Sequence, residues 1–217
     1  MELLQERIRR EGRVLPGNIV KVDGFLNHRV DTRLLEDIAD EFAKYFDTSK
    51  ITVVLTAEAS GIALATICAQ KYGVPMLFAK KAKSDNIEGG LYQSDIFSYT
   101  YKKKVTLLVS KEWLSADDKV LIIDDFMANG EAMRGLCDIV DMSGATLVGI
   151  GCAVEKGFQG GGDRLPRLPQ TVGGINTEGV DGRRIAPAVR ERLCHGPHAG
   201  GAGLRGGGIV EIDHSKT

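Results

Sequence analysis

The sequence lacks the long apolar runs and the excess of one charge that would suit a membrane or a nucleic acid. Its 217 residues carry a formal net charge of −1, which does not favour a protein that coats nucleic acid or binds a membrane surface. No apolar run approaches the length of a membrane span, and residues 1–11 are charged, without the apolar core of a secretory signal. We therefore expect a cytoplasmic protein whose partners include neither nucleic acid nor membrane.

Cysteine is scarce and follows no recognisable spacing. The chain has Cys68, Cys137, Cys152 and Cys194, which are far apart and form no C-x-x-C pair. A zinc site or a disulfide framework would show closer or regular spacing. Three of these residues stand among apolar residues of predicted helices or strands, so we interpret them as reduced thiols of the core.

Aromatic residues are absent from the last part of the chain. Residues 160–217 contain no Phe, Tyr or Trp, but they hold 14 of the 27 glycines and four of the six prolines. Such a segment has little to bury and a high entropic cost of ordering. We therefore predict a folded domain over residues 1–162 and a tail over residues 163–217 that is poorly ordered or results from a frameshift in the gene.

The rest of the sequence alternates apolar strands with amphipathic helices. Strands are predicted at 51–55, 76–79, 120–123 and 146–154, a hairpin at 94–101 and 105–109, an extended segment at 14–28, and helices at 2–11, 62–72 and 131–143. A further helix, capped by Asp31, has an apolar stripe made of Leu34, Leu35, Ile38, Ala39 and Phe42. This alternation predicts an α/β fold with a parallel sheet flanked by helices. Ligands of such sheets bind beyond the carboxyl ends of the strands.

The strand that ends in Asp124 and Asp125 carries the strongest functional signal. Four apolar residues lead to these two carboxylates, and a short turn of small residues then opens a helix. Backbone N–H groups at a helix N-terminus favour a phosphate, and small residues let it approach closely. The carboxylates can accept hydrogen bonds from sugar hydroxyls. A helix dipole alone would explain one aspartate but not two, so the pattern indicates a site for a phosphorylated sugar.

This segment resembles the signature of the type I phosphoribosyltransferases, which bind phosphoribosyl pyrophosphate (PRPP). The resemblance implies that Asp124 and Asp125 are catalytic residues that hold the ribose. It implies that the 5′-phosphate binds to the turn formed by Ala128, Asn129, Gly130, Glu131 and Ala132. The family often has Thr or Ser in this turn, so the alanines shift phosphate binding toward backbone groups. The implied cofactor is Mg²⁺, which PRPP carries and the protein does not bind directly.

Two other turns fall where this family binds pyrophosphate. The turn after the first core strand contains Ser60 and Gly61, whose N–H groups can donate to pyrophosphate; the alternative is an ordinary serine N-cap. Lys80 and Lys81 begin a long polar stretch that ends near Lys104. In the family this stretch is a loop that closes over the reaction, and its lysines could neutralise pyrophosphate. A solvated run of charges is the alternative interpretation.

Residues 1–162 resemble the bacterial xanthine phosphoribosyltransferases almost without gaps, with residues 1–30 as an N-terminal hood over the base. The resemblance places Val20, Asn27 and Lys156 against xanthine. An ammonium and an amide suit a base with two carbonyls better than they suit adenine. It also implies a homodimer that salvages purines by making xanthosine 5′-monophosphate and pyrophosphate.

Three alternatives stay open from the sequence. The base could be hypoxanthine, guanine or adenine. The chain could be a regulator that senses PRPP without catalysis, although no helix-turn-helix pattern or basic stripe accompanies the domain. Finally, the unusual tail could leave the enzyme inactive.

Overall fold

The computed structural model describes residues 2–15, 19–81, 90–98, 103–155, 171–176 and 186–187. The helices in these ranges are α1 (Glu2–Glu11), α2 (Thr32–Ala43), α3 (Gly61–Tyr72) and α4 (Glu131–Ser143), with a π-helical turn at Asp23–Asn27 and a 3₁₀ turn at Thr48–Lys50. The strands are β1 (Arg13–Leu15), β2 (Ile19–Lys21), β3 (Val53–Ala57), β4 (Met76–Ala79), β5 (Leu91–Ser98), β6 (Lys103–Ser110), β7 (Lys119–Met127), β8 (Thr146–Glu155), β9 (Thr171–Asn176) and β10 (Ala186–Pro187).

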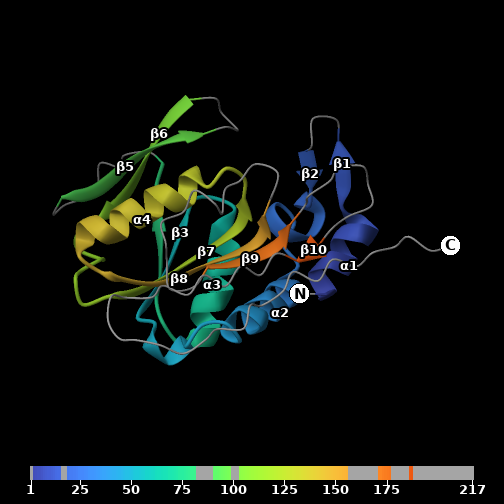
Figure 1. The fold of residues 1–217 in the computed structure, drawn as a ribbon, viewed down its shortest axis with the longest axis horizontal. Coiled ribbons are helices and arrows are strands. Elements are labelled where there is room, and N and C mark those ends of the chain that lie inside the picture. Colours follow the sequence, from blue (N-terminus) through green and yellow to red (C-terminus); the bar gives the residue numbers. More distant parts are fainter. Residues whose placement is uncertain are drawn as a thin grey trace, which may run out of the picture.

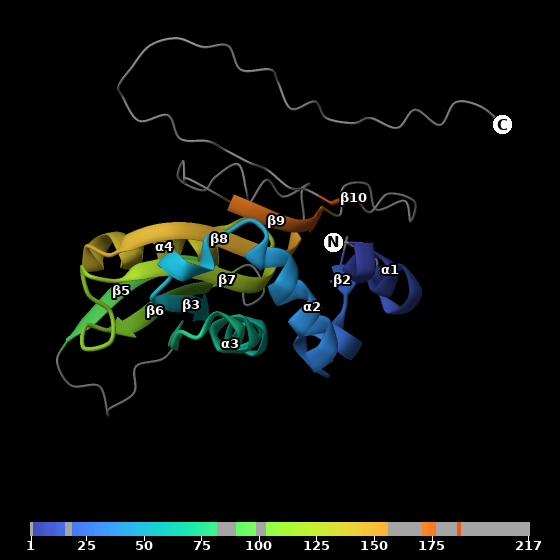
Figure 2. The ribbon, with the colours of Figure 1, turned by 90° about the horizontal axis from the view of Figure 1, so that it is seen from below.

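A parallel sheet forms the centre of the molecule (Figure 1). Its strand order is β10-β9-β8-β7-β3-β4. Strands β9, β8, β7, β3 and β4 pair in parallel, and β10 pairs antiparallel to β9 at the edge. Helix α3 lies on one face and α4 on the other (Figure 2). The predicted α/β fold with a parallel sheet flanked by helices is therefore confirmed.

The sheet separates two hydrophobic cores, because successive side chains of a strand point to opposite faces. Val54, Leu121 and Ile123 pack with α1, α2 and α3 on one face. Leu55 and Ile122 pack on the other face with α4 and with the β5–β6 hairpin. Val54, Leu55, Leu121, Ile122 and Ile123 are all 0% exposed. Burial on both faces explains why these strands are continuously apolar in the sequence.

The helix ends follow the signals that the sequence carries. The Asp31 carboxylate accepts a hydrogen bond from the Leu34 N–H at 3.3 Å, which caps α2. All five residues of the predicted apolar stripe of this helix are buried. Gly73 ends α3 with φ +71° and Gly144 ends α4 with φ +75°, a backbone conformation that glycine adopts without steric cost.

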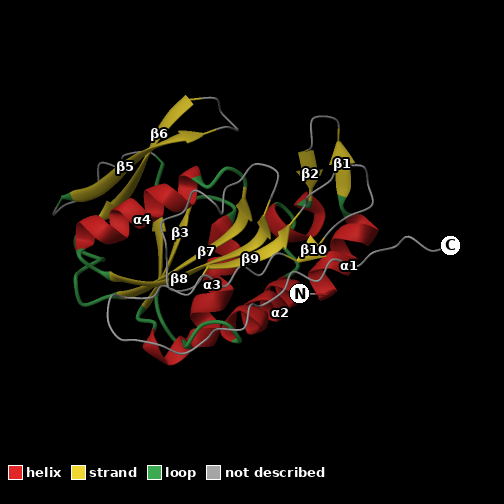
Figure 3. Cartoon of the chain, in the orientation of Figure 1, coloured by secondary structure: helices red, strands yellow, loops and turns green. Residues whose placement is uncertain are grey.

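The hood differs from the extended segment expected at residues 14–28. Strands β1 and β2 form a short antiparallel hairpin, visible in Figure 3 beside α1. The chain then coils into the π-helical turn Asp23–Asn27. Phe25 and Leu26 are adjacent, and both are 1% exposed. An extended strand would turn one of them toward the opposite face, whereas the compact turn buries both, which explains the difference.

Two segments of the predicted tail lie in the sheet. Strand β9 pairs with β8 between Ile150 and Glu155, and β10 pairs with β9. The other residues after 155 lie outside the described part of the chain. The division into a domain of 1–162 and a tail of 163–217 therefore stays a prediction. In the described residues, no helix is long and apolar enough to cross a bilayer.

Candidate functional site

A cavity of about 370 Å³ opens beyond the carboxyl ends of β3 and β7. It brings together most of the residues that the sequence singled out. Those that line it are Val20, Asn27, Ser60, Lys81, Asp124, Asp125, Ala128, Asn129, Gly130, Glu131 and Ala132. Gly61 and Lys80 are not among the residues that line it, and Lys156 lies outside the described residues. The cavity stands where an open parallel sheet binds ligands.

Asp124 and Asp125 belong to strand β7, not to the turn after it. The strand was expected to end at Ile123, but it continues to Met127 because β8 pairs with it up to Glu155. Asp124 is 7% exposed and Asp125 is 1% exposed. Two adjacent carboxylates are therefore buried at the mouth of the sheet, where burial needs compensating contacts.

Local hydrogen bonds offset only part of the free-energy cost of burying these two carboxylates. The Asp125 N–H donates to Asp124 Oδ1 at 2.9 Å, and the Ser60 hydroxyl donates to Asp125 Oδ1 at 2.8 Å. Ser60 stands at the N-cap position of α3 but makes no capping hydrogen bond with its side chain. The alternative that Ser60 is an ordinary N-cap is therefore wrong. Its hydroxyl instead orients one of the two aspartates.

Burial raises the pKa of Asp124 well above its ordinary value. The negative charge of Asp125 and the hydrogen bond between the two side chains raise this pKa further, whereas the Lys81 ammonium lowers it. A cation or a hydrogen-bond donor that enters the cavity would favour the ionised carboxylate for the same reason.

Two buried polar atoms of residues that line the cavity have no hydrogen-bond partner among the described residues. These are Asp125 Oδ2 and Asn129 Nδ2, both buried. Buried polar atoms are usually paired, so unpaired ones at a cavity indicate a bound molecule. The carboxylate oxygen calls for a donor such as a sugar hydroxyl, and the amide nitrogen calls for an acceptor such as a phosphate oxygen.

The turn between β7 and α4 leaves room for an anion. Gly130 has φ +80°, which only glycine adopts readily. Ala128 and Ala132 present no more than a methyl group, and α4 begins at Glu131. The first N–H groups of a helix have no partner within the helix and favour an anion. Residues 128–132 therefore leave space and backbone donors for an anion, and their role as the 5′-phosphate site (the phosphate cradle) stays a prediction.

Gly61 does not line the cavity, but it packs against Asp124, which does. A Cβ atom added there would overlap Asp124 Oδ1 and Thr56 Oγ1. Glycine at the start of α3 therefore lets the Asp124 carboxylate pack directly against the helix. The sequence predicts that the Gly61 N–H binds pyrophosphate, and that role stays a prediction.

The sequence missed Glu58 and Phe97, which also line the cavity. Glu58 Oε1 accepts the N–H of Lys81 at 2.5 Å, a contact that joins the ends of two neighbouring strands. Lys80 exchanges backbone hydrogen bonds with Leu108, so it anchors the chain to β6. Glu58 stands in a turn that the sequence did single out, but Phe97 gives no sequence signal apart from its place in the hairpin.

Known proteins match both the sequence and the fold. Residues 30–164 match the phosphoribosyl transferase domain family. Xanthine phosphoribosyltransferase of Lachnoclostridium phytofermentans is 53% identical over 168 residues, which cover 77% of this chain and 87% of that protein. The enzyme of the same name from Bifidobacterium longum is 52% identical over 166 residues, or 76% of this chain and 86% of that protein.

Solved structures agree on the fold at much lower identity. Adenine phosphoribosyltransferase from Saccharomyces cerevisiae has a TM-score of 0.65 at 18% identity and covers 77% of this chain and 97% of its own. The Rhodothermus marinus protein of that name has a TM-score of 0.64 at 20% identity, over 80% of this chain and 98% of its own. The family match and the level of identity agree, and the chain belongs to the xanthine phosphoribosyltransferase family.

Proposed function

We propose that this enzyme transfers the phosphoribosyl group of PRPP to xanthine and releases pyrophosphate. The products are xanthosine 5′-monophosphate and pyrophosphate. The observation that carries the proposal is that the paired aspartates, the phosphate cradle and the hood residues Val20 and Asn27 line one cavity. This arrangement occurs in a chain about half identical to named xanthine phosphoribosyltransferases.

Asp124 and Asp125 are proposed to hold the ribose. The unpaired Asp125 Oδ2 can accept a hydrogen bond from a ribose hydroxyl, and Ser60 fixes the other oxygen of that carboxylate. A nitrogen of the base attacks the anomeric carbon while the bond to pyrophosphate breaks, so positive charge develops on the sugar ring. Two fixed carboxylates stabilise that charge better than water does, because they do not have to reorient.

The 5′-phosphate is proposed to bind to residues 128–132. Backbone N–H groups at the start of α4 donate to it, and the Asn129 amide supplies a further donor. Gly130, Ala128 and Ala132 have side chains no larger than a methyl group, so the phosphate can come close to the backbone. Binding at this remote end fixes the sugar, and such positioning contributes to the rate of the reaction at the anomeric carbon.

The pyrophosphate is proposed to leave toward Ser60, Gly61, Lys80 and Lys81. Lys81 lines the cavity, and an ammonium there offsets part of the charge of the leaving group. The carboxylates of Asp124 and Asp125 on the cavity wall are oxygen groups that suit an Mg²⁺ ion arriving with PRPP. When bound, Mg²⁺ would supply positive charge that offsets the charge of the leaving pyrophosphate.

The base is proposed to lie under the hood. Val20 and Asn27 line the cavity from β2 and from the π-helical turn, so one gives an apolar wall and the other an amide. In the sequence, Lys156 follows directly after Glu155, the last residue of β8. A lysine offers donors and a positive charge but no acceptor, so it favours a base with carbonyl groups.

The deciding experiment is incubation of the enzyme with PRPP, Mg²⁺ and each purine base in turn, with nucleotide measured by chromatography. We expect xanthosine 5′-monophosphate with the highest kcat/KM. A higher value for hypoxanthine, guanine or adenine would reassign the base. Binding of PRPP without turnover of any base would favour a sensor or an enzyme inactivated by its tail.

Base recognition has its own test in Lys156→Ala. If Lys156 contacts xanthine, the variant loses roughly ten- to a hundredfold in kcat/KM for xanthine, because a polar group of the base is left unpaired. The KM for PRPP should change much less. Equal small changes for both substrates would remove Lys156 from the base site and leave it as a solvated charge.

The family also suggests the setting in which the enzyme works. We propose a cytoplasmic homodimer. Light scattering of the full chain at working concentration measures the mass of the particle, and a monomer mass would count against the dimer.

A further inference from the structure

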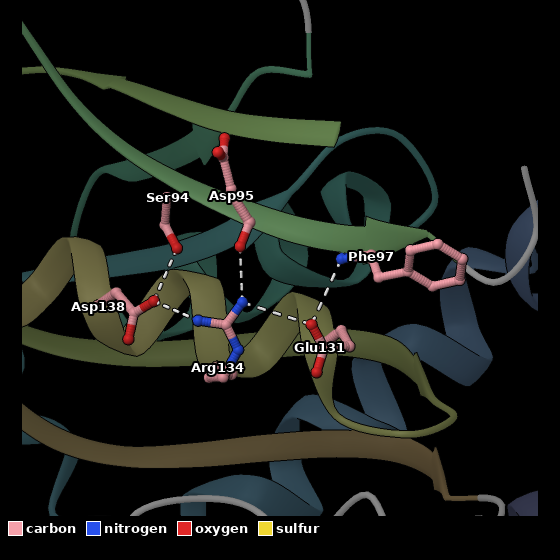
Figure 4. Close-up of polar contacts among 6 residues, drawn as sticks. All are labelled: Ser94, Asp95, Phe97, Glu131, Arg134 and Asp138. Atoms are coloured by element: carbon pink, nitrogen blue, oxygen red, sulfur yellow. Dashed lines mark hydrogen bonds and ion pairs between the residues drawn. The ribbon is translucent and has the colours of Figure 1, made fainter. Parts of the chain in front are cut away.

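The face of α4 that points to the β5–β6 hairpin carries a chain of polar contacts with Arg134 at its centre (Figure 4). Arg134 Nη1 donates to Asp138 Oδ2 at 2.6 Å, and Nη2 donates to the main-chain carbonyl of Asp95 at 2.6 Å. Nη2 also lies 3.4 Å from Glu131 Oε2. Asp138 in turn accepts the Ser94 hydroxyl at 2.7 Å. One guanidinium therefore joins two turns of the helix to strand β5.

Glu131 connects this chain of contacts to the phosphate cradle. It is the first residue of α4 and lines the cavity, so its N–H belongs to the proposed cradle. Its side chain instead points to the hairpin, where Oε2 accepts the N–H of Phe97 at 3.3 Å. A carboxylate this close to the cradle repels a phosphate unless its charge is offset. Arg134 supplies the positive charge that offsets it.

The same contacts fix the hairpin at the mouth of the cavity. Phe97 lines the cavity and is 41% exposed, and its main chain is held by Glu131. Gly135 allows β5 to approach α4, because a Cβ there would lie 2.5 Å from Ile96 Cγ2. Arg134 therefore contributes to the position of the hairpin and to the direction of the Glu131 carboxylate.

We propose that Arg134 is a positioning residue for the binding of PRPP. It neutralises Glu131, holds this carboxylate away from the phosphate cradle and helps to fix strand β5 at the mouth of the cavity. The inference rests on the proposed function, because the cradle at residues 128–132 is part of it. Arg134 itself acts through Glu131 and touches neither substrate.

The test is Arg134→Met, which keeps the length of the side chain but removes its charge. We expect the KM for PRPP to rise about tenfold, because the uncompensated Glu131 carboxylate repels the phosphate. kcat and the KM for xanthine should change less than threefold. Raising the ionic strength should reduce the defect, because salt screens exposed charges. A merely structural role of Arg134 would not give a defect that depends on salt in this way.

A second substitution separates charge from packing. Glu131→Gln in the Arg134→Met background removes the repelling charge and should return the KM for PRPP to within about threefold of wild type. Lys44→Met is the matched control: it breaks an ion pair with Glu41 of 2.6 Å on α2, away from the cavity, and should leave both KM values unchanged.

The inference fails if Arg134→Met binds PRPP as wild type does, or if Glu131→Gln does not restore the KM. Should Arg134→Met not fold by circular dichroism, Arg134→Lys and Arg134→Gln answer the same question. The Arg134→Lys variant must then have a lower KM for PRPP than the Arg134→Gln variant. Equal KM values in the two variants refute the role of charge. Failure of the proposed function is distinct, since the wild-type enzyme would then form no nucleotide from any base.

Discussion

At the scale of single residues, the site is built at a cost to stability. Asp124 and Asp125 are buried side by side, and Asp125 Oδ2 and Asn129 Nδ2 have no partner within the described ranges. A folded chain selected for stability alone would neutralise or replace such groups. Asp124 can pack in its observed position because Gly61 has no Cβ atom that would overlap its carboxylate. A polar ligand that donates to Asp125 Oδ2 and accepts from Asn129 Nδ2 would offset this cost.

Asp124→Asn should lower turnover and raise stability in the same molecule. We expect kcat to fall at least about a hundredfold, because a charge that stabilises the transition state is removed. The asparagine Oδ1 can still accept the Asp125 N–H, and the circular dichroism spectrum should not change. Asp125→Asn should lower kcat similarly; normal turnover in both variants would refute the ribose role.

The stability effect has a defined dependence on pH. Because the pKa of Asp124 is raised in the folded state, the unfolded chain loses this proton first as pH rises. The free energy of unfolding therefore falls between the ordinary aspartate pKa and the raised one, and then stays lower. We expect the melting temperature of Asp124→Asn to match wild type at low pH and to exceed it at neutral pH. A difference that is constant with pH would contradict the raised pKa.

At the scale of elements, the hairpin β5–β6 and helix α4 form one unit at the rim of the cavity. They share the second hydrophobic core through Ile96 and Leu107, and the contacts of Arg134 fix their edges. Gly135 of α4 lies so close to the hairpin that an added Cβ would overlap Ile96. Glycine inside a helix normally costs stability relative to alanine, so its presence here reflects the close approach of β5.

Gly135→Ala should therefore destabilise the protein, although replacing glycine by alanine inside a helix normally increases stability. Alanine improves helix propensity by about 1 kcal/mol, but its Cβ would lie 2.5 Å from Ile96 Cγ2 and 3.0 Å from Leu107 Cδ1. Such overpacking costs about 1–3 kcal/mol, so we expect a net loss in thermal unfolding experiments and a higher KM for PRPP.

Gly24→Ala is the control for this prediction. A Cβ at Gly24 meets nothing within 4 Å, so the substitution should be close to neutral. If Gly135→Ala unfolds at the same temperature as wild type or higher, the close docking of the hairpin on α4 is wrong.

The sequence predicts the elements better than it predicts the contacts between them. Periodicity and capping place α2 and α4 almost to the residue, because they are local signals. Local sequence signals do not predict the π-helical turn of the hood. This turn forms because it buries both Phe25 and Leu26 in the hydrophobic core, which is a tertiary contact. Asp124 and Asp125 are predicted from their motif, whereas Phe97 and Arg134 are not: their roles arise only when the hairpin packs on α4.

At the scale of the whole molecule, we expect binding of PRPP at the proposed phosphate cradle to stabilise the folded state. A ligand that binds only the native state stabilises it by about 2.7 kcal/mol at a hundred times its Kd. For a chain of this size, that raises the melting temperature by roughly 5–10 °C. The cradle lies between β7 and α4, at the centre of the sheet order. Binding there should therefore stabilise the whole domain.

We expect PRPP with Mg²⁺ to raise the melting temperature of wild type and to leave Gly130→Val unchanged. Valine at φ +80° is strained, and its branched side chain would crowd the cradle. Gly73→Val is a matched control, because Gly73 has φ +71°, ends α3, and has nothing within 4 Å of an added Cβ. Without ligand, both variants should melt lower than wild type, since both carry the same kind of backbone strain. With ligand, only Gly73→Val should regain the shift, whereas a full shift in Gly130→Val would mean that PRPP does not use the backbone of this turn.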